Sequence, residues 1–221
     1  MRHLASPPAL RQTHASWRAS YPWRRRAWLV AGSFVAAASA WAHGGAPSGE
    51  GPGTWSALAA GLLHPLTGPD HVIAMVAVGL WGAVLGTPAL WLLPVVFPLV
   101  MALGGAAALV GLPLPGVEIG IALSGLALGL AVALRWRAPL ALAAVLVGAF
   151  AVFHGHAHGT ELPQAASPLA YSAGFVISTG LLHLAGVAFG AWGRSPAGWV
   201  AIRSAGGLIA AGGLWFLVRA L

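Results

Sequence analysis

The sequence contains no cysteine, so it has no disulfide bond, no thiolate metal ligand and no thiol nucleophile. Charged residues are also scarce, at 7% of 221 residues. A soluble domain carries about 25% charged residues, and this chain has too few to cover a surface in water. Together with a hydrophobic content of 58%, this excludes an ordinary soluble enzyme and a disordered chain. The composition indicates an integral membrane protein.

Acidic residues are the scarcest charged type, with only four in the chain and none before Glu50. Six of the eleven basic residues precede residue 27, so the formal net charge of +7 describes mainly the N-terminal tail. A nucleic-acid-binding protein needs a basic surface on its folded part, and this chain has none there. No nucleotide-binding motif is present. We therefore expect neither nucleic acid nor nucleotide as a partner.

Residues 1–42 have the parts of a secretory signal peptide: a basic region, the short apolar run Ala27–Ala40 and small-residue cleavage patterns. The apolar run is short for a spanning helix, which needs about 20 residues. Cleavage after Ala42 would leave His43 at the start of an exposed linker over residues 43–53, which is rich in Gly, Pro and Ser. A twin-arginine signal and an uncleaved first helix stay open as alternatives.

Residues 54–221 are predicted to form an all-α, polytopic transmembrane helical bundle. The first apolar stretch is too long for one straight span of a hydrocarbon core of roughly 30 Å. We expect it to be broken near Pro65–Pro69, which gives six crossings or seven helical segments. The predicted stretches are 54–86, 88–111, 117–135, 138–157, 168–192 and 199–219.

The arginines favour this count of crossings. Arg135 and Arg137 follow the third stretch, and Arg194 and Arg203 lie between the fifth and the sixth. If the first stretch crosses once and the mature N-terminus is outside, all four lie on the cytoplasmic side, as the positive-inside rule requires. Two crossings would place all four outside. Arg219, at the outer end, is a minor exception.

A first ionisable cluster brackets the predicted helix break. In the segment His64-Pro65-Leu66-Thr67-Gly68-Pro69-Asp70-His71, two histidines and an aspartate meet at the break. Charged residues are costly inside a membrane, and broken membrane helices commonly form ion sites from their freed ends. The alternative is an aspartate at the N-terminus of a helix beside two histidines in ordinary hydrogen bonds.

A second cluster lies in Phe153-His154-Gly155-His156-Ala157-His158-Gly159-Thr160-Glu161. His154, His158 and Glu161 share one helix face if the helix continues to Pro163. Two imidazoles and a carboxylate can bind a borderline divalent ion. His156 points elsewhere and ranks lower, and a His-rich helix end at the water interface is the alternative.

Two further residues are secondary candidates for the ion path. Glu118 begins the third span, where a lone acid could be only an N-terminal helix charge. His183 lies within the fifth span, where a lone histidine is often a packed, hydrogen-bonded residue. With six crossings, both clusters and Glu118 fall in the outer half of the membrane. This common depth predicts an ion-capture site that opens to the outside.

The two clusters have the forms H-x5-D-H and F-H-G-x-[AV]-H-G-x-E, which resemble the motifs of the HupE/UreJ family of nickel and cobalt membrane transporters. The resemblance extends over about residues 43–221. It implies a permease of the cytoplasmic membrane with a cleaved signal, which takes up Ni²⁺ for hydrogenase or urease maturation. It also implies that the metal ligands are His64, Asp70, His71, His154, His158 and Glu161.

His156 stands at a variable position of the family motif, and the His43-Gly44 start also resembles the family. His43, as a free N-terminus, could pre-capture a cation. The ion is expected as the transported substrate, with no permanently bound cofactor. Nitrogen and oxygen ligands suit Ni²⁺ and Co²⁺ but do not select between them.

Three other functions remain as alternatives. An intramembrane metalloenzyme could use Glu161 or Asp70 as a general base. However, the chain has no HExxH motif and too few histidines for a di-iron hydroxylase, so we predict that it is not an enzyme. A carrier of protons or other cations could use the same acids. A metal sensor or chaperone would bind the ion without transporting it.

Overall fold

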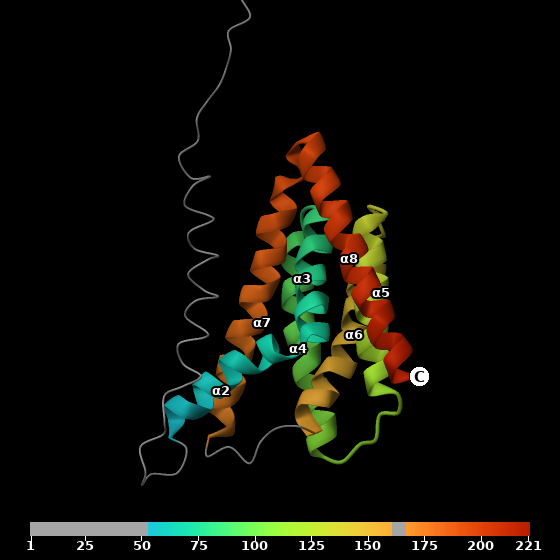
Figure 1. The fold of residues 1–221 in the computed structure, drawn as a ribbon. Coiled ribbons are helices and arrows are strands. Elements are labelled where there is room, and N and C mark those ends of the chain that lie inside the picture. The colour runs from blue at the N-terminus through green and yellow to red at the C-terminus, as the bar shows by residue number, and fades with distance from the viewer. Residues whose placement is uncertain (1–52, 161–166) are drawn as a thin grey trace, which may run out of the picture. The chain divides into compact units, whose positions relative to one another are not determined.

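The computed structural model describes residues 53–160 and 167–221, which form helices and contain no strand (Figure 1). The predicted all-α class is confirmed, and the helix boundaries follow the predicted stretches closely. Residues 1–42, most of the predicted linker with His43, and Glu161 lie outside the described residues. The helices are α2 (Thr54–Thr67), α3 (Pro69–Leu85), α4 (Ala89–Leu109), α5 (Val117–Ala133), α6 (Leu140–Thr160), α7 (Pro168–Gly190), the 3-10 helix η1 (Ala191–Arg194) and α8 (Pro196–Ala220).

Four of these helices, α4, α6, α7 and α8, are long and apolar enough to cross a membrane. Helices α2 and α3, of 14 and 17 residues, are long enough for a span only when taken together, and they are bent by 83° at their junction. The apolar helix α5 is shorter, with 17 residues. The six predicted crossings correspond to these four helices, the bent pair and α5.

The break in the first stretch lies at Gly68, and Pro69 begins α3. A proline at the first helical position is favourable because its missing N–H has no partner there in any helix. The break thus lies within the predicted range Pro65–Pro69, but Pro65 itself does not break the helix, since α2 continues through it to Thr67. Near the end of a short helix, Pro65 removes only the hydrogen bond to the carbonyl of Gly61.

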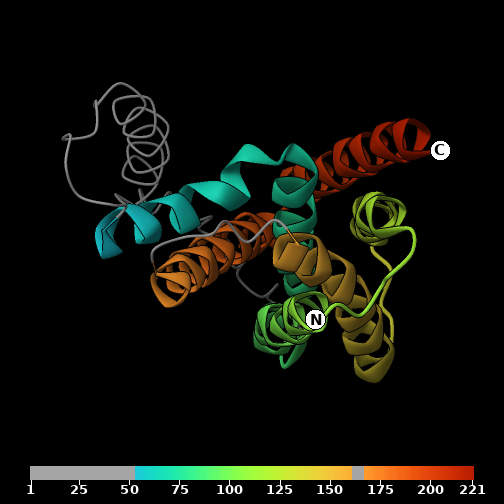
Figure 2. The same cartoon turned by 90° about the horizontal axis from the view of Figure 1, so that it is seen from below.

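Helix α2 does not continue the direction of α3 but packs along the N-terminal half of α7 (Figures 1 and 2). Small residues permit this approach. A Cβ on Gly61 would overlap the backbone carbonyl of Tyr171, and one on Gly174 would overlap the carbonyl of Leu58. The broken helix is therefore fixed by backbone-to-backbone contact.

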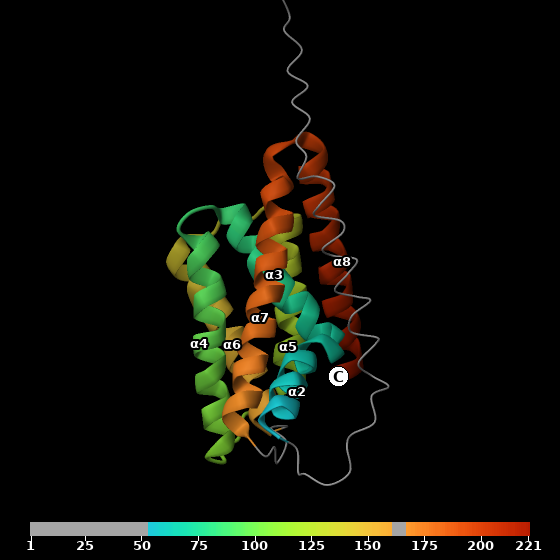
Figure 3. The same ribbon diagram turned by 90° about the vertical axis from the view of Figure 1, so that its left-hand side faces the viewer.

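Glycine also sets the two most extensive helix contacts, between α4 and α6 and between α5 and α8 (Figure 3). A Cβ on Gly155 would overlap the carbonyl of Met101, and one on Gly129 would overlap the backbone of Ala210. Membrane helices use small residues in this way to approach one another closely. Because Gly155 adjoins His154, this packing also positions the histidines of α6.

With the exception of Arg219, in the last turn of α8, the arginines of the described helices gather at one end of the bundle, where α5 ends and α8 begins. The guanidinium of Arg135 lies 3.7 Å from the ring centroid of Trp199. Arg203 Nε donates to the carbonyl of Ala133 at 2.9 Å. The opposite end carries the N-termini of α3 and α5 and the C-termini of α6 and α8, together with the residues predicted to bind the ion.

Candidate functional site

The first turn of α3 fixes one histidine through its neighbouring carboxylate. Asp70 Oδ1 accepts hydrogen bonds from the backbone N–H of His71 at 3.0 Å and from its ring Nδ1 at 2.9 Å. In the neutral ring, the proton of His71 therefore sits on Nδ1, and Nε2 keeps its lone pair. That Nε2 is buried and has no hydrogen-bond partner. A carboxylate behind a histidine is the arrangement that orients metal-ligating imidazoles.

A serine fixes the second histidine in the same manner. The single hydroxyl proton of Ser124, on α5, is donated to the carbonyl of Ile121 at 2.6 Å. Ser124 Oγ lies 2.9 Å from His154 Nε2 and therefore accepts a hydrogen bond from the N–H at that position. His154 Nδ1 therefore keeps its lone pair, and this atom is buried without a hydrogen-bond partner. Sequence reasoning missed Ser124, because a lone serine in an apolar helix carries no signal of its own.

Four histidine rings from three helices meet at this end. The centroid of the His71 ring lies 4.5 Å from that of His158 and 4.9 Å from that of His154. His64, from the last turn of α2, places its Nε2 3.1 Å from His158 Nδ1. The structure thus joins the motifs at 64–71 and 153–161, which are far apart in the sequence.

The cluster is compact but is not arranged around one central point. Across residues 53–160 and 167–221, no three His, Asp or Glu side chains are placed as they would be around a metal ion. The close approach of His64 to His158 and the bond of Asp70 to His71 account for this. A bound ion would have to replace the contact between His64 and His158.

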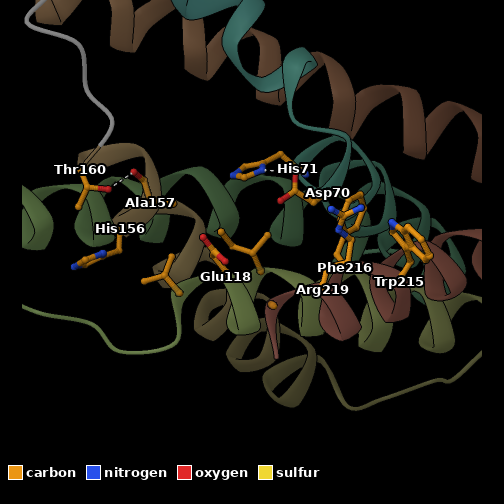
Figure 4. Close-up of a pocket in the computed structure, with 12 residues that line it drawn as sticks. Asp70, His71, Glu118, His156, Ala157, Thr160, Trp215, Phe216 and Arg219 are labelled. Atoms are coloured by element: carbon orange, nitrogen blue, oxygen red, sulfur yellow. Dashed lines mark hydrogen bonds and ion pairs between the residues drawn. The ribbon is translucent and has the colours of Figure 1, made fainter.

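A cavity of about 630 Å³ leads to the Asp70–His71 pair from the same end (Figure 4). Its walls include Glu118, from the first turn of α5, and Arg219, from the last turn of α8. Sequence reasoning placed Arg219 at this end but assigned it no part in the site. Two acids and one arginine thus face the cavity, which has room for a hydrated ion.

His156 lines this cavity, but its ring contacts a backbone carbonyl and not the clustered histidines. Its ring Nε2 donates to the backbone carbonyl of Leu112 at 2.8 Å, which ties α6 to the connection between α4 and α5. The sequence ranked His156 below its neighbours because it lies on another face of α6. The hydrogen bond to Leu112 gives it a structural role.

His183 lies away from the four clustered histidines, on α7, and is fully buried. The ring of Phe97, on α4, lies between His183 and His154 of the cluster. Its centroid is 5.3 Å from that of His154 and 5.2 Å from that of His183. Aromatic rings from α7 close the other side, with Phe175 at 4.4 Å from His158. Sequence reasoning named neither phenylalanine, because aromatic residues are frequent in any membrane helix.

Comparison with known proteins gives two matches. The family model described as HupE / UreJ protein matches residues 25–216. Among curated proteins, Protein HupE of Rhizobium leguminosarum bv. viciae is 46% identical over 159 residues, which cover 72% of this chain and 83% of that protein. No solved structure matches the chain.

Proposed function

Because the chain belongs to the HupE / UreJ family of multi-pass membrane proteins, we propose that it is a permease for Ni²⁺, or Co²⁺, in the cytoplasmic membrane. The observation that carries the proposal is the meeting of the two histidine motifs at the broken helix. Four imidazoles and one carboxylate gather there, and Asp70 and His71 among them line the cavity. Ionisable groups are costly in a membrane, and a site of this kind marks an ion path.

The proposed path begins in the cavity, where Asp70 and Glu118 attract the hydrated ion. The lone pairs of His71 Nε2 and His154 Nδ1 then replace part of its water shell. His64, His158 and Glu161 complete the ligand set, and His43 is a further candidate outside. Asp70 acts chiefly through His71, whose ring it orients.

The proposed direction of ion transport follows from the positions of the arginines. With the arginine-bearing end in the cytoplasm, the cavity and the mature N-terminus face outward. An inside-negative potential then favours a divalent cation by about 4.6 kcal/mol per 100 mV, twice the single-charge value. In this proposal the ion supplies hydrogenase or urease maturation, and no resident cofactor is required.

The test is accumulation of ⁶³Ni²⁺ in cells that lack their own nickel permeases, with and without this chain, under excess Mg²⁺. Saturable uptake that Co²⁺ inhibits supports the proposal.

His158→Ala and Asp70→Asn should abolish uptake at unchanged abundance in the membrane, and normal uptake in either variant contradicts the ligand set. Recovery of hydrogenase or urease activity at limiting nickel identifies the client.

The alternative functions predict results that differ from those of a nickel permease. A proton carrier would show a pH response in vesicles without added metal. A sensor or chaperone would bind Ni²⁺ but would not accumulate it. A membrane metalloenzyme would also accumulate none, although the chain is present in the membrane.

A further inference from the structure

A second group of buried polar atoms lies on α7, deeper than the four clustered histidines. Thr179 and His183 are each 0% exposed. Neither the hydroxyl of Thr179 nor either ring nitrogen of His183 has a hydrogen-bond partner. The two residues are one helical turn apart and share a face of α7. Buried polar groups are nearly always paired, so three buried atoms without a hydrogen-bond partner on one helix face are candidates to bind a polar ligand or an ion.

A backbone oxygen from α4 adds to this group. The carbonyl of Pro94 interacts with the His183 ring, though without hydrogen-bond geometry. In a regular helix this carbonyl would accept from the N–H of residue 98, but residue 98 is Pro98, which has none. The His183 ring therefore lies beside an α4 carbonyl that has no helical partner, and the Thr179 hydroxyl lies one turn earlier on the same face of α7.

The group is connected to the outer cluster along α7. Every fourth residue from Tyr171 to His183 is buried, and Phe175, the second of them, contacts the His158 ring. At 1.5 Å per residue, His183 lies about 12 Å further along α7 than Phe175, and about 10 Å before the helix end at Gly190. In the described part of the chain, His183 is the one His, Asp or Glu between the outer cluster and the arginine-bearing end.

We propose that His183, Thr179 and the Pro94 carbonyl form a second, inner binding site, which the divalent ion occupies after it leaves the outer cluster. The proposal rests on the proposed function. One imidazole with two neutral oxygens suits a borderline divalent ion. This set is weaker than four imidazoles with a carboxylate, and a conducting path needs such weakening so that the ion can leave.

The first experiment measures ⁶³Ni²⁺ uptake in cells together with Ni²⁺ binding to the purified full chain. His183→Leu should lower the uptake rate at least tenfold, and Thr179→Val, which keeps the side-chain shape, at least threefold. Affinity at the outer cluster should stay within twofold of the parent chain. Ser178→Ala is the matched control: it removes the adjacent buried hydroxyl and should leave uptake unchanged. Parent-like uptake in His183→Leu at equal abundance overturns the inner site.

The second experiment does not depend on transport. With His71→Ala and His158→Ala disabling the outer cluster, equilibrium dialysis should still find one weakly bound Ni²⁺ per chain. Adding His183→Leu or Thr179→Val should remove or weaken it, and unchanged binding overturns the inner site. If the parent chain shows no uptake, the proposed function fails, while dialysis still decides on the inner site. If the His183→Leu protein is not found in the membrane at the abundance of the parent chain, the Thr179→Val variant decides both experiments.

Discussion

At the scale of single residues, neighbouring oxygens decide which nitrogen each histidine offers. Asp70 holds the proton of His71 on Nδ1, and Ser124 holds that of His154 on Nε2. In the neutral form of each ring, the lone pair therefore lies on a buried nitrogen that has no hydrogen-bond partner. A neutral imidazole with a fixed tautomer binds a divalent ion with little reorganisation.

Ser124→Ala should therefore weaken Ni²⁺ binding by about tenfold, as the loss of partners behind metal ligands typically does. The variant removes the acceptor that holds the His154 proton on Nε2, so that His154 Nδ1 is no longer fixed as the free nitrogen. The measurement is the Kd of the purified chain for Ni²⁺, with Ser178→Ala as a control for loss of a buried hydroxyl. Equal affinity in the parent and Ser124→Ala would show that the tautomer is set elsewhere.

At the scale of elements, the break between α2 and α3 holds the Asp70–His71 pair as well as redirecting the chain. A Cβ on Gly68 would lie 3.0 Å from His71 Nδ1 and 3.1 Å from Asp70 Oδ1. The backbone at Gly68 has φ −96°, which any residue can adopt. A side chain there would force the side chains of Asp70 and His71, which fold back over the position, to shift.

Gly68→Ala should accordingly disturb the Asp70–His71 pair while the helices persist. We expect weaker Ni²⁺ binding and slower ⁶³Ni²⁺ uptake with unchanged helical content by circular dichroism. Gly53→Ala is the control, since a Cβ there meets nothing within 4 Å. Parent-like uptake in Gly68→Ala would mean that the pair tolerates displacement.

The contact between α4 and α6 supports a second prediction at this scale. Gly155→Ala places a methyl group against the backbone carbonyl of Met101, which cannot rotate away. Separating the helices should cost about 1–3 kcal/mol, as overpacking does, and should displace His154 and His158. Thermal unfolding in detergent and uptake measure the two effects. Gly180→Ala, on an open face of α7, should leave both at parent values.

The helices also show how much of the structure could be predicted from the sequence. Hydropathy and Gly/Pro punctuation predicted the helical stretches and the break, because both signals are local. The 83° bend and the docking of α2 on α7 depend on contacts such as that of Gly61 with Tyr171, which no local pattern encodes. The meeting of the two motifs followed from their common depth in the membrane. The roles of Ser124 and Phe97 needed coordinates, because each is an ordinary residue in its own helix.

At the scale of the whole molecule, charge is distributed unevenly between the two ends of the described bundle. Arg135 and Arg203 contact backbone and aromatic groups at one end. Asp70 and Glu118, together with Arg219, line the cavity at the other. If the arginine-bearing end is cytoplasmic, the acids face the incoming cation and the membrane potential favours its inward movement.

This orientation can be tested because the chain has no cysteine of its own. Leu112→Cys introduces a thiol at a 58% exposed position at the cavity end, and Ala197→Cys introduces one on the exposed first turn of α8 at the arginine-bearing end. A membrane-impermeant maleimide should label Leu112→Cys in intact spheroplasts and Ala197→Cys only after permeabilisation. Retained ⁶³Ni²⁺ uptake in both variants would show that labelling reports on the working protein. The reverse labelling pattern would place the cavity in the cytoplasm, and the acids and histidines would then lie on the exit side of any inward path.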